Sequence, residues 1–326
     1  MTIRIDTAAM AARRVRYADL IPCTTAFIDT RTPGSDRKEN FTIIGPGVAE
    51  NPDQHVHISE PHGFNIGGAR QPPHCVNSQH SHETAEVFAV LSGDWKFTMG
   101  VDKADSEINL HPGDIISIPT NCFRGFENVG SDSGFLFAVL GGDDPGRVTW
   151  APDVLRRAAS TGLVLLENGA LIDTAAGRQV PPGQVAVRPL EPAELERFDR
   201  INAAALAGCV VRAGETAATE TQNGLPEALV IGRGGVLDWP HGFTVSRVDL
   251  SAGAAGAWHA HDQPEVLFVL AGTAQLEWDD GKLDLAPGDT MSVPRTLMRR
   301  LSSTDGAGAT LLAVRGGDAL PWATPV

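Results

Sequence analysis

The chain has 326 residues, more than one ordinary domain, so two domains are expected. Its 40 acidic and 26 basic residues give a net charge of −14, and no Lys/Arg cluster offers the basic surface that nucleic acid requires. No apolar run approaches the roughly 18 residues of a membrane span, no secretory signal opens the chain, and the four cysteines lack CxxC spacing. We therefore expect a cytoplasmic protein with free thiols that binds neither nucleic acid nor a membrane.

The predicted elements are short. The 35 glycines and 22 prolines separate apolar runs of four to six residues, a pattern typical of an all-β sandwich or barrel. Between two such regions we expect helices at 152–160 and 192–207, and a hairpin at 163–173. Its Asn168-Gly169 pair predicts a two-residue type I′ turn. The expected domains are an N-terminal arm (1–39), a first barrel (40–145), a connector (146–224) and a second barrel (225–326).

The two barrel regions repeat the same residues. At an offset of 179, the first copy's His80, His82 and Glu86 recur as His259, His261 and Glu265. Further on, Pro-Gly-Asp at 112–114 recurs at 287–289, and Arg124 recurs as Arg299, at an offset of 175. The second copy therefore lacks four residues (179 − 175), which fall in the polar loop at 100–105, where a change of length is tolerated.

The repeated histidines and glutamates have the spacing of metal ligands. Side chains of a strand alternate with period two, so two histidines at i and i+2 and a glutamate four residues later share one face. Two imidazoles and one carboxylate form a facial triad that suits non-haem Fe(II), Mn or Ni. We predict a divalent metal, with Fe(II) preferred and Mn, Ni or Zn as alternatives, on His80, His82 and Glu86 and on His259, His261 and Glu265.

These residues resemble the first motif of the cupins, G(X)5HXH(X)3,4E(X)6G. The second copy matches it completely, from Gly253 to Gly272, and the first copy has His74 in place of the opening glycine. The chain is thus similar to a bicupin over 40–145 and 225–320. This resemblance implies two tandem cupin barrels (double-stranded β-helix or jelly-roll) with a short helical connector, and a homo-oligomer.

Both copies depart from the second cupin motif, G(X)5PXG(X)2H(X)3N. Arg124 and Arg299 stand at its histidine, and a guanidinium does not coordinate a metal. Two unit charges ~4 Å apart repel by about 4 kcal/mol at an effective dielectric of ~20, and a dication roughly doubles this. We predict that Arg124 holds an anionic substrate through a bidentate contact. The alternative is an Arg124–Glu86 and an Arg299–Glu265 ion pair in barrels without metal.

Three functions stay open. The first is an Fe(II) dioxygenase acting on a small anionic or aromatic substrate, with Arg124 and Gln79 as candidate catalytic residues. The second is a non-catalytic, metal-free ligand-binding bicupin, and the third is a metal-dependent isomerase or lyase, in which the metal is a Lewis acid. Related bicupins include quercetin and gentisate dioxygenases and oxalate decarboxylases. Polar residues such as Asn77 surround the first copy's motif, so the first barrel is the better candidate for an active site.

Other histidines have a structural interpretation. His55 and His57 form a second HxH pair, but no carboxylate follows at the right spacing, so we predict a surface strand. His62 and His241 recur before glycine and are read as polar residues at a strand start. Tyr17, the single tyrosine, precedes both barrels, so no phenolic acid or base is expected inside either.

Overall fold

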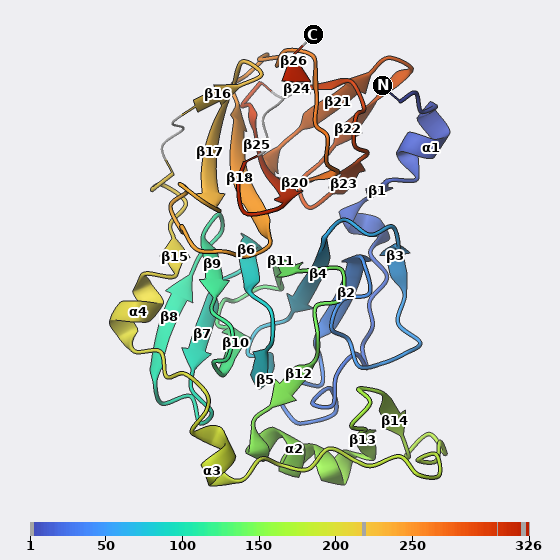
Figure 1. Cartoon of the computed structure of the whole chain (residues 1–326), viewed down its shortest axis with the longest axis vertical. Coiled ribbons are helices and arrows are strands. Elements are labelled where there is room, and N and C mark those ends of the chain that lie inside the picture. Colours follow the sequence, from blue (N-terminus) through green and yellow to red (C-terminus); the bar gives the residue numbers. More distant parts are fainter. Residues whose placement is uncertain (1–2, 217–219, 305, 321–323, 326) are drawn as a thin grey trace. The chain divides into compact units, whose positions relative to one another are not determined.

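The computed structural model describes residues 3–216, 220–304, 306–320 and 324–325 (Figure 1). Most of the described elements are strands and the helices are short, so the all-β prediction is confirmed. The chain forms two compact units. One comprises residues 21–59 and 65–210, and the other comprises residues 1–20, 60–64 and 211–326.

The first unit contains a barrel of two sheets. The larger sheet has the order β15-β9-β6-β11-β4-β2-β3, with β15 (Val210–Val211) at its edge, and the smaller has the order β12-β5-β10-β7-β8. The pair of β2 with β3 is parallel, whereas β6 pairs antiparallel with both β9 and β11, and β10 pairs antiparallel with both β5 and β7. The other strands of the larger sheet are β2 (Glu39–Ile44), β3 (Val56–Ile58), β4 (Phe64–Gln71), β6 (Glu86–Ser92), β9 (Ile115–Ile118) and β11 (Gly134–Gly141). The smaller consists of β5 (Val76–His82), β7 (Trp95–Met99), β8 (Ser106–Leu110), β10 (Arg124–Asn128) and β12 (Val148–Trp150). The aromatic rings of Phe88, Phe97 and Phe126 pack in its core with centroids 5.2–5.5 Å apart.

The second unit repeats this barrel. Its larger sheet has the order β1-β23-β20-β25-β18-β17-β16, and its smaller sheet has the order β22-β21-β24-β19-β26. The larger sheet consists of β1 (Arg14–Val15), β16 (Glu220–Gln222), β17 (Leu225–Ile231), β18 (Phe243–Leu250), β20 (Glu265–Gly272), β23 (Thr290–Val293) and β25 (Ala309–Gly316). The smaller consists of β19 (His259–Ala260), β21 (Ala274–Trp278), β22 (Gly281–Leu285), β24 (Arg299–Ser303) and β26 (Thr324–Pro325).

The strand registers show that the two barrels are copies. Arg124 pairs with His80 across β10 and β5, and Arg299 pairs with His259 across β24 and β19. The loop between β7 and β8 is longer than its counterpart between β21 and β22. Met99 pairs with Ser106 across the first loop, and Trp278 pairs with Gly281 across the second. The shortened loop predicted from the sequence is therefore where the second copy is shorter.

The N-terminal segment is divided between the two units. Residues 3–20 form α1 (Thr7–Ala11), β1 and a 3-10 turn, η1 (Tyr17–Asp19), and belong to the second barrel. Asp6 caps α1, Met10 is buried in the core of the second barrel, and β1 pairs with β23. Residues 21–39 belong to the unit of the first barrel.

The connector begins as predicted, but its hairpin turn differs. Helix α2 (Pro152–Ala158) and the 3-10 turn η2 (Ala159–Thr161) are followed by β13 (Leu163–Leu165) and β14 (Leu171–Asp173). The predicted two-residue type I′ turn is wrong, because the amide of Leu166 donates to the carbonyl of Ala170 and that of Gly169 donates to Leu166. These bonds close a three-residue loop, in which Gly169 takes the left-handed conformation at φ +90°.

The single helix predicted at 192–207 is wrong as well. The structure has two short helices, α3 (Pro192–Leu195) and α4 (Ala203–Ala207), before β15 (Val210–Val211). Between them the chain turns at 196–198 and then bridges to the barrel, where the amide of Asp199 donates to the carbonyl of Asn121. Asn202 then caps a new helix by accepting from the amide of Ala205. Tertiary hydrogen bonds thus override the helical periodicity.

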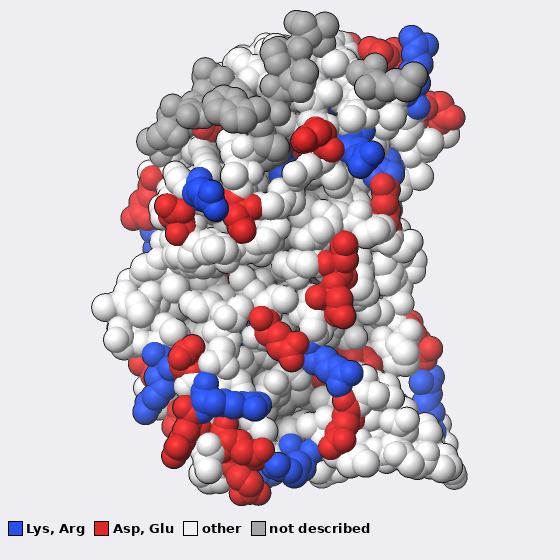
Figure 2. Space-filling view, viewed as in Figure 1, with Lys and Arg blue, Asp and Glu red and all other residues white. Residues whose placement is uncertain are grey.

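No described helix is long and apolar enough to cross a membrane. On the face shown in Figure 2, acidic and basic side chains are interspersed, without a continuous basic surface.

Candidate metal centre

Three side chains of the first barrel converge as the sequence predicts. Among the described residues, His80, His82 and Glu86 are the group of His, Cys, Asp or Glu whose ligand atoms all lie within 4.8 Å of one another. The two histidines lie at the end of β5 and the glutamate begins β6, and each is at most 5% exposed. Two ligands of one ion at ~2.1 Å and right angles lie about 3.0 Å apart. The 3.6 Å between His82 Nε2 and Glu86 Oε1 is close to that spacing.

The imidazoles are held in a form that can bind a metal. His80 Nδ1 lies 2.7 Å from the carbonyl oxygen of Ser78, so Nδ1 carries the proton and Nε2 keeps its lone pair. Burial, with a contribution from Arg124, lowers the pKa of His80 well below its ordinary value, so the ring is neutral. His82 Nδ1 is buried without a hydrogen-bond partner. His80 thus offers Nε2 to a metal, and the His82 ring offers a nitrogen that no other described group engages by a hydrogen bond.

Arg124 forms the ion pair that the sequence left as an alternative. Its Nη2 donates to Glu86 Oε2 at 2.7 Å, and its Nη1 donates to the carbonyl of His80 at 3.4 Å. Arg124 is 1% exposed. Burial raises the pKa of the Glu86 carboxyl to about 8, whereas the positive charge of a guanidinium 2.7 Å away favours the ionised form. Arg124 supplies that cation at Oε2, while Oε1 faces His82.

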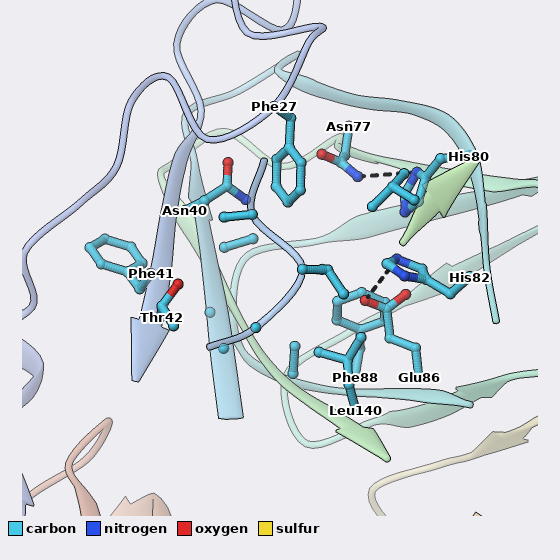
Figure 3. A pocket seen from close by; sticks show the side chains of 18 of the residues that line it. Phe27, Asn40, Phe41, Thr42, Asn77, His80, His82, Glu86, Phe88 and Leu140 are labelled. Atoms are coloured by element: carbon cyan, nitrogen blue, oxygen red, sulfur yellow. Dashed lines mark hydrogen bonds and ion pairs between the residues drawn. The ribbon is translucent and has the colours of Figure 1, made fainter. Parts of the chain in front are cut away.

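The ligand cluster forms one side of a cavity of about 70 Å³ in the first barrel. In Figure 3, His80, His82 and Glu86 lie opposite Asn40, Phe41 and Thr42, with Phe27 and Phe88 on the walls between them. The walls are mostly apolar or aromatic, as small-molecule sites usually are. The lining side chains that are not metal-ligand candidates include Phe27, Asn40, Phe41, Thr42, Ile66, Asn77, Phe88, Phe126, Leu140 and Trp150. Arg124 is not among the lining residues.

Gln79, a candidate catalytic residue, is not brought to the cluster. Its amide nitrogen donates to the carbonyls of Gly100 and Thr98 at 2.7 and 3.2 Å, and its oxygen accepts from Thr98 Oγ1 at 3.1 Å. It lies on β5 next to His80, so strand alternation turns it to the opposite face. There it lines a different cavity, beside Val101 and Pro152.

The second barrel brings its predicted ligands together with two arginines. Glu265 Oε2 accepts from Arg299 at 2.6 Å, and Oε1 accepts from Arg315 Nε at 2.8 Å. Arg315 also donates to Glu227 at 2.6 Å. Although burial opposes it, the two guanidinium groups hold the pKa of Glu265 well below its ordinary value. Both carboxylate oxygens are engaged, so this site does not fit a metal as the first does.

The histidines of the second barrel are neutral as well. Burial lowers the pKa of His259 to about 4 and that of His261 to about 3. Neither nitrogen of the His261 ring has a hydrogen-bond partner, although its Nε2 lies 3.6 Å from Glu265 Oε1.

Two residue differences distinguish the surroundings of the first barrel's ligands from those of the second barrel's. In the second barrel, Glu265 lies opposite Arg315 on the neighbouring strand. In the first barrel, Glu86 lies opposite Leu140, so a leucine stands at the position of Arg315. Ala69 and Val248 are equivalent positions of the two copies, because they are 179 residues apart. Ala69 pairs with Asn40 and Val248 pairs with Glu227, so the first barrel has an asparagine where the second has this glutamate. Where the second barrel has the Arg315–Glu227 ion pair, the first barrel has Leu140 and Asn40, which line its cavity.

The remaining histidines have local partners. His57 on β3 accepts from the amide of Ile21, and His55 is exposed. His62 Nε2 lies 2.7 Å from Ser292 Oγ within the second unit, and His241 Nδ1 lies 2.6 Å from the carbonyl of Trp239.

Some residues of the first site were outside the reach of the motif. Phe27, Asn40 and Trp150 line the cavity from outside the HxH motif. Phe27 precedes β2, Asn40 lies on β2 and Trp150 lies on β12. Nothing in the sequence indicated their role, because Phe27 and Trp150 lie outside the two motifs from which the repeat was recognised. Asn77 was noted only as a polar neighbour.

The chain contains two cupin domains, one in each barrel. Residues 69–140 and 246–315, one stretch in each barrel, match the family model of the cupin domain. No curated protein sequence matches the chain significantly.

Solved structures of oxalate decarboxylase share this fold. A Bacillus subtilis oxalate decarboxylase described for its Mn(II) centres aligns with 99% of this chain and 80% of its own, with a TM-score of 0.59 and 12% identity. The Bacillus subtilis enzyme at pH 4.6 aligns with 99% of this chain and 79% of its own, with a TM-score of 0.58 and 11% identity. A structure describing the substrate binding mode of oxalate decarboxylase aligns with 99% of this chain and 80% of its own, with a TM-score of 0.60 and 12% identity. At such identity the likeness is one of fold.

Proposed function

We propose that this bicupin is a metal-dependent enzyme whose first barrel is the active one. His80, His82 and Glu86 would hold one divalent ion, and the substrate would be a small molecule with an apolar or aromatic body and an anionic group. The observation that supports this most strongly is the convergence of the three buried ligands beside a largely apolar cavity. The engaged carboxylate of Glu265 leads us to propose no ion in the second barrel.

Fe(II) and dioxygen chemistry are the finer part of this proposal. Arg124 stands at the fourth ligand position of the family and does not coordinate, so the protein supplies three ligands and leaves three positions open. Two histidines and one carboxylate with open positions are typical of non-haem Fe(II) oxygenases. A bound Fe(II) would supply open coordination positions and one-electron chemistry with dioxygen.

The chain's own residues would prepare the site. Arg124 would keep Glu86 ionised and aim its Oε1 at the ion, rather than clamp the substrate, because its guanidinium lies on Glu86. The sum of a dication, Arg124 and Glu86 is +2, which favours an anionic substrate. The aromatic wall of Phe27 and Trp150 would exclude water and stack on a flat substrate.

Metal analysis followed by an oxygen-electrode screen tests the proposal. Protein purified without added metal should contain about one Fe per chain and consume oxygen with an aromatic diol or hydroxy acid. His80→Ala should abolish the metal content, whereas His259→Ala, the matched change in the second barrel, should leave it unchanged. Equal loss in both variants, or metal that survives both, would contradict the assignment.

A specific observation supports a second candidate function. The Arg124–Glu86 pair satisfies the charge of the carboxylate without any ion, so a metal-free ligand-binding bicupin is the alternative. Absence of metal from the purified protein, together with absence of oxygen uptake, would favour it. Metal without oxygen uptake would favour an isomerase or lyase, and Mn instead of Fe would point the same way. We also propose a homo-oligomer, which light scattering tests.

A further inference from the structure

A buried ion pair next to the first cavity has no role in the function proposed above. Lys38 and Asp29 are both 0% exposed at their side chains and are joined by a short contact. Lys38 Nζ also donates to Asn77 Oδ1 at 2.9 Å, and Asp29 Oδ2 accepts from the amide of Ser78 at 3.2 Å. A buried pair is weak evidence for stability, because desolvation offsets its attraction. Stability alone therefore does not account for the Lys38–Asp29 pair.

A β-bulge places Asn77 in the cavity. Arg124 pairs with His80 and Phe126 pairs with Asn77, so two residues of β5 lie opposite one residue of β10. Asn77 and His80 are three residues apart and would point to opposite faces of a regular strand, but the extra residue restores a common face. Asn77 accordingly lines the same cavity as His80, as Figure 3 shows.

Lys38 determines which end of the Asn77 amide faces the site. An ammonium group only donates, so the amide atom next to Lys38 is the oxygen and the N–H groups point the other way. The amide nitrogen lies 3.5 Å from His80 Nδ1, but that atom already donates its proton to Ser78. Among the described residues, no oxygen accepts from the amide nitrogen of Asn77. Its N–H groups are therefore available to a ligand.

The second barrel lacks this arrangement. At the repeat offset of 179, Asn77 corresponds to Gly256 and Ser78 to Ala257. The fold therefore forms without an amide at this position, and the Lys38–Asn77 contact belongs to the barrel that has the cavity.

We propose that Asn77 is a substrate-binding residue, oriented by Lys38, whose N–H groups bind an anionic oxygen of the substrate beside His80. The inference rests on the proposed function for the site, and it narrows the substrate class to small aromatic or apolar carboxylates. Phe27 and Trp150, whose ring centroids lie 5.3 and 5.9 Å from Lys38 Nζ, form the wall next to this donor. Lys38 acts through Asn77 and is a positioning residue.

The test compares two probes of similar shape in ¹⁹F NMR binding titrations with the full chain. One probe, 4-fluorobenzoate, has a carboxylate, and 4-fluorotoluene has none. Asn77→Ala should weaken 4-fluorobenzoate binding by about tenfold or more, as expected for a hydrogen bond to a charged acceptor, and leave 4-fluorotoluene unchanged. Asn77→Asp retains the size and the Lys38 contact but replaces the donor by an acceptor, so it should weaken 4-fluorobenzoate binding at least as much.

The positioning role is tested by the double variant Lys38→Met/Asp29→Asn, which leaves no unpaired buried charge. It should weaken 4-fluorobenzoate binding several-fold, and adding Asn77→Ala should cause less than the full further loss. Lys96→Met, a change at a partly exposed lysine of the same barrel, is the control and should have no effect.

Several outcomes would overturn the inference. These are absence of 4-fluorobenzoate binding to the unmodified chain, undiminished binding to folded Asn77→Asp, or equal losses for both probes. Wild-type binding in the Lys38→Met/Asp29→Asn variant would remove the positioning role. Metal content measured on the same samples separates these outcomes from failure of the proposed function, because the Asn77 variants should retain the metal of the unmodified protein.

Discussion

Removing Arg315 should destabilise the second barrel more than removing Arg315 and Glu227 together. Arg315 contacts Glu265 at 2.6 Å and Glu227 at 2.6 Å, and its side chain is 3% exposed. With Arg299, the four charges of this cluster sum to zero. Arg315→Leu leaves one net negative charge in the interior, whereas Glu227→Asn/Arg315→Leu restores neutrality and reproduces the Asn40 and Leu140 of the first barrel.

The magnitude follows from the cost of a buried unpaired charge. Breaking a buried pair by removing one partner costs about 3–5 kcal/mol, whereas replacing both partners is often close to neutral. The double variant should therefore recover about 2–4 kcal/mol of the stability that the single variant loses. This coupling is large enough to be measured by chemical denaturation followed by tryptophan fluorescence.

The matched control is the ion pair of Arg300 with Glu277 in the same barrel. Its nitrogen and oxygen are 2.7 Å apart, but the two side chains are 35% and 31% exposed. Arg300→Leu should cost no more than about 1 kcal/mol, and Glu277→Gln should recover little of it. If Arg315→Leu costs no more than Arg300→Leu, or if Glu227→Asn fails to restore stability, the reasoning about the buried cluster is refuted.

Three further changes are expected to have measurable effects. Arg124→His removes a cation and restores the fourth ligand of the family, so calorimetry should show tighter Fe(II) binding, and an unchanged affinity would mean that Arg124 does not limit it. Because burial lowers the pKa of His259 to about 4 and of His261 to about 3, the unfolded chain takes up protons below its ordinary pKa of 6.5 while the folded chain does not. Stability should fall as the pH drops from 6.5 towards 4, by up to ~1.4 kcal/mol per pH unit for each ring, and His259→Gln/His261→Gln should flatten this decline in acid titrations. Gly125→Ala would place a Cβ 1.9 Å from the oxygen of Gln79 and 2.7 Å from the carbonyl of Asn77, so it should lower stability by roughly 1–3 kcal/mol, and a wild-type denaturation midpoint would contradict the tight packing of the bulge.

The sequence by itself determined the repeat and the ligand cluster of the first barrel. Strand alternation is a local rule, so the spacing of His80, His82 and Glu86 was enough to place three side chains on one face. The same register put Arg124 opposite His80, as the family motif implied. The class of fold followed from short apolar runs and frequent turn residues.

Only the tertiary structure decided which charges meet. Arg315 and Glu227 lie 88 residues apart, and their contact depends on two strands that do not follow each other in the chain. No periodic pattern records such a pairing. The sequence therefore predicted the same three ligands in both barrels and favoured the first only for the polar residues around its motif. The structure shows that only one of them has a carboxylate oxygen that no arginine engages.

The bulge in β5 was also beyond the reach of the sequence. Period-two alternation places both Asn77 and Gln79 on the face opposite His80. Gln79 was a candidate only because it is a polar residue next to the motif, and nothing in the sequence favoured Asn77 over it. The extra residue turns Asn77 into the cavity and leaves Gln79 on the opposite face, bonded to Thr98 and Gly100. A bulge is a property of how two strands pair, and one strand read alone does not contain that information.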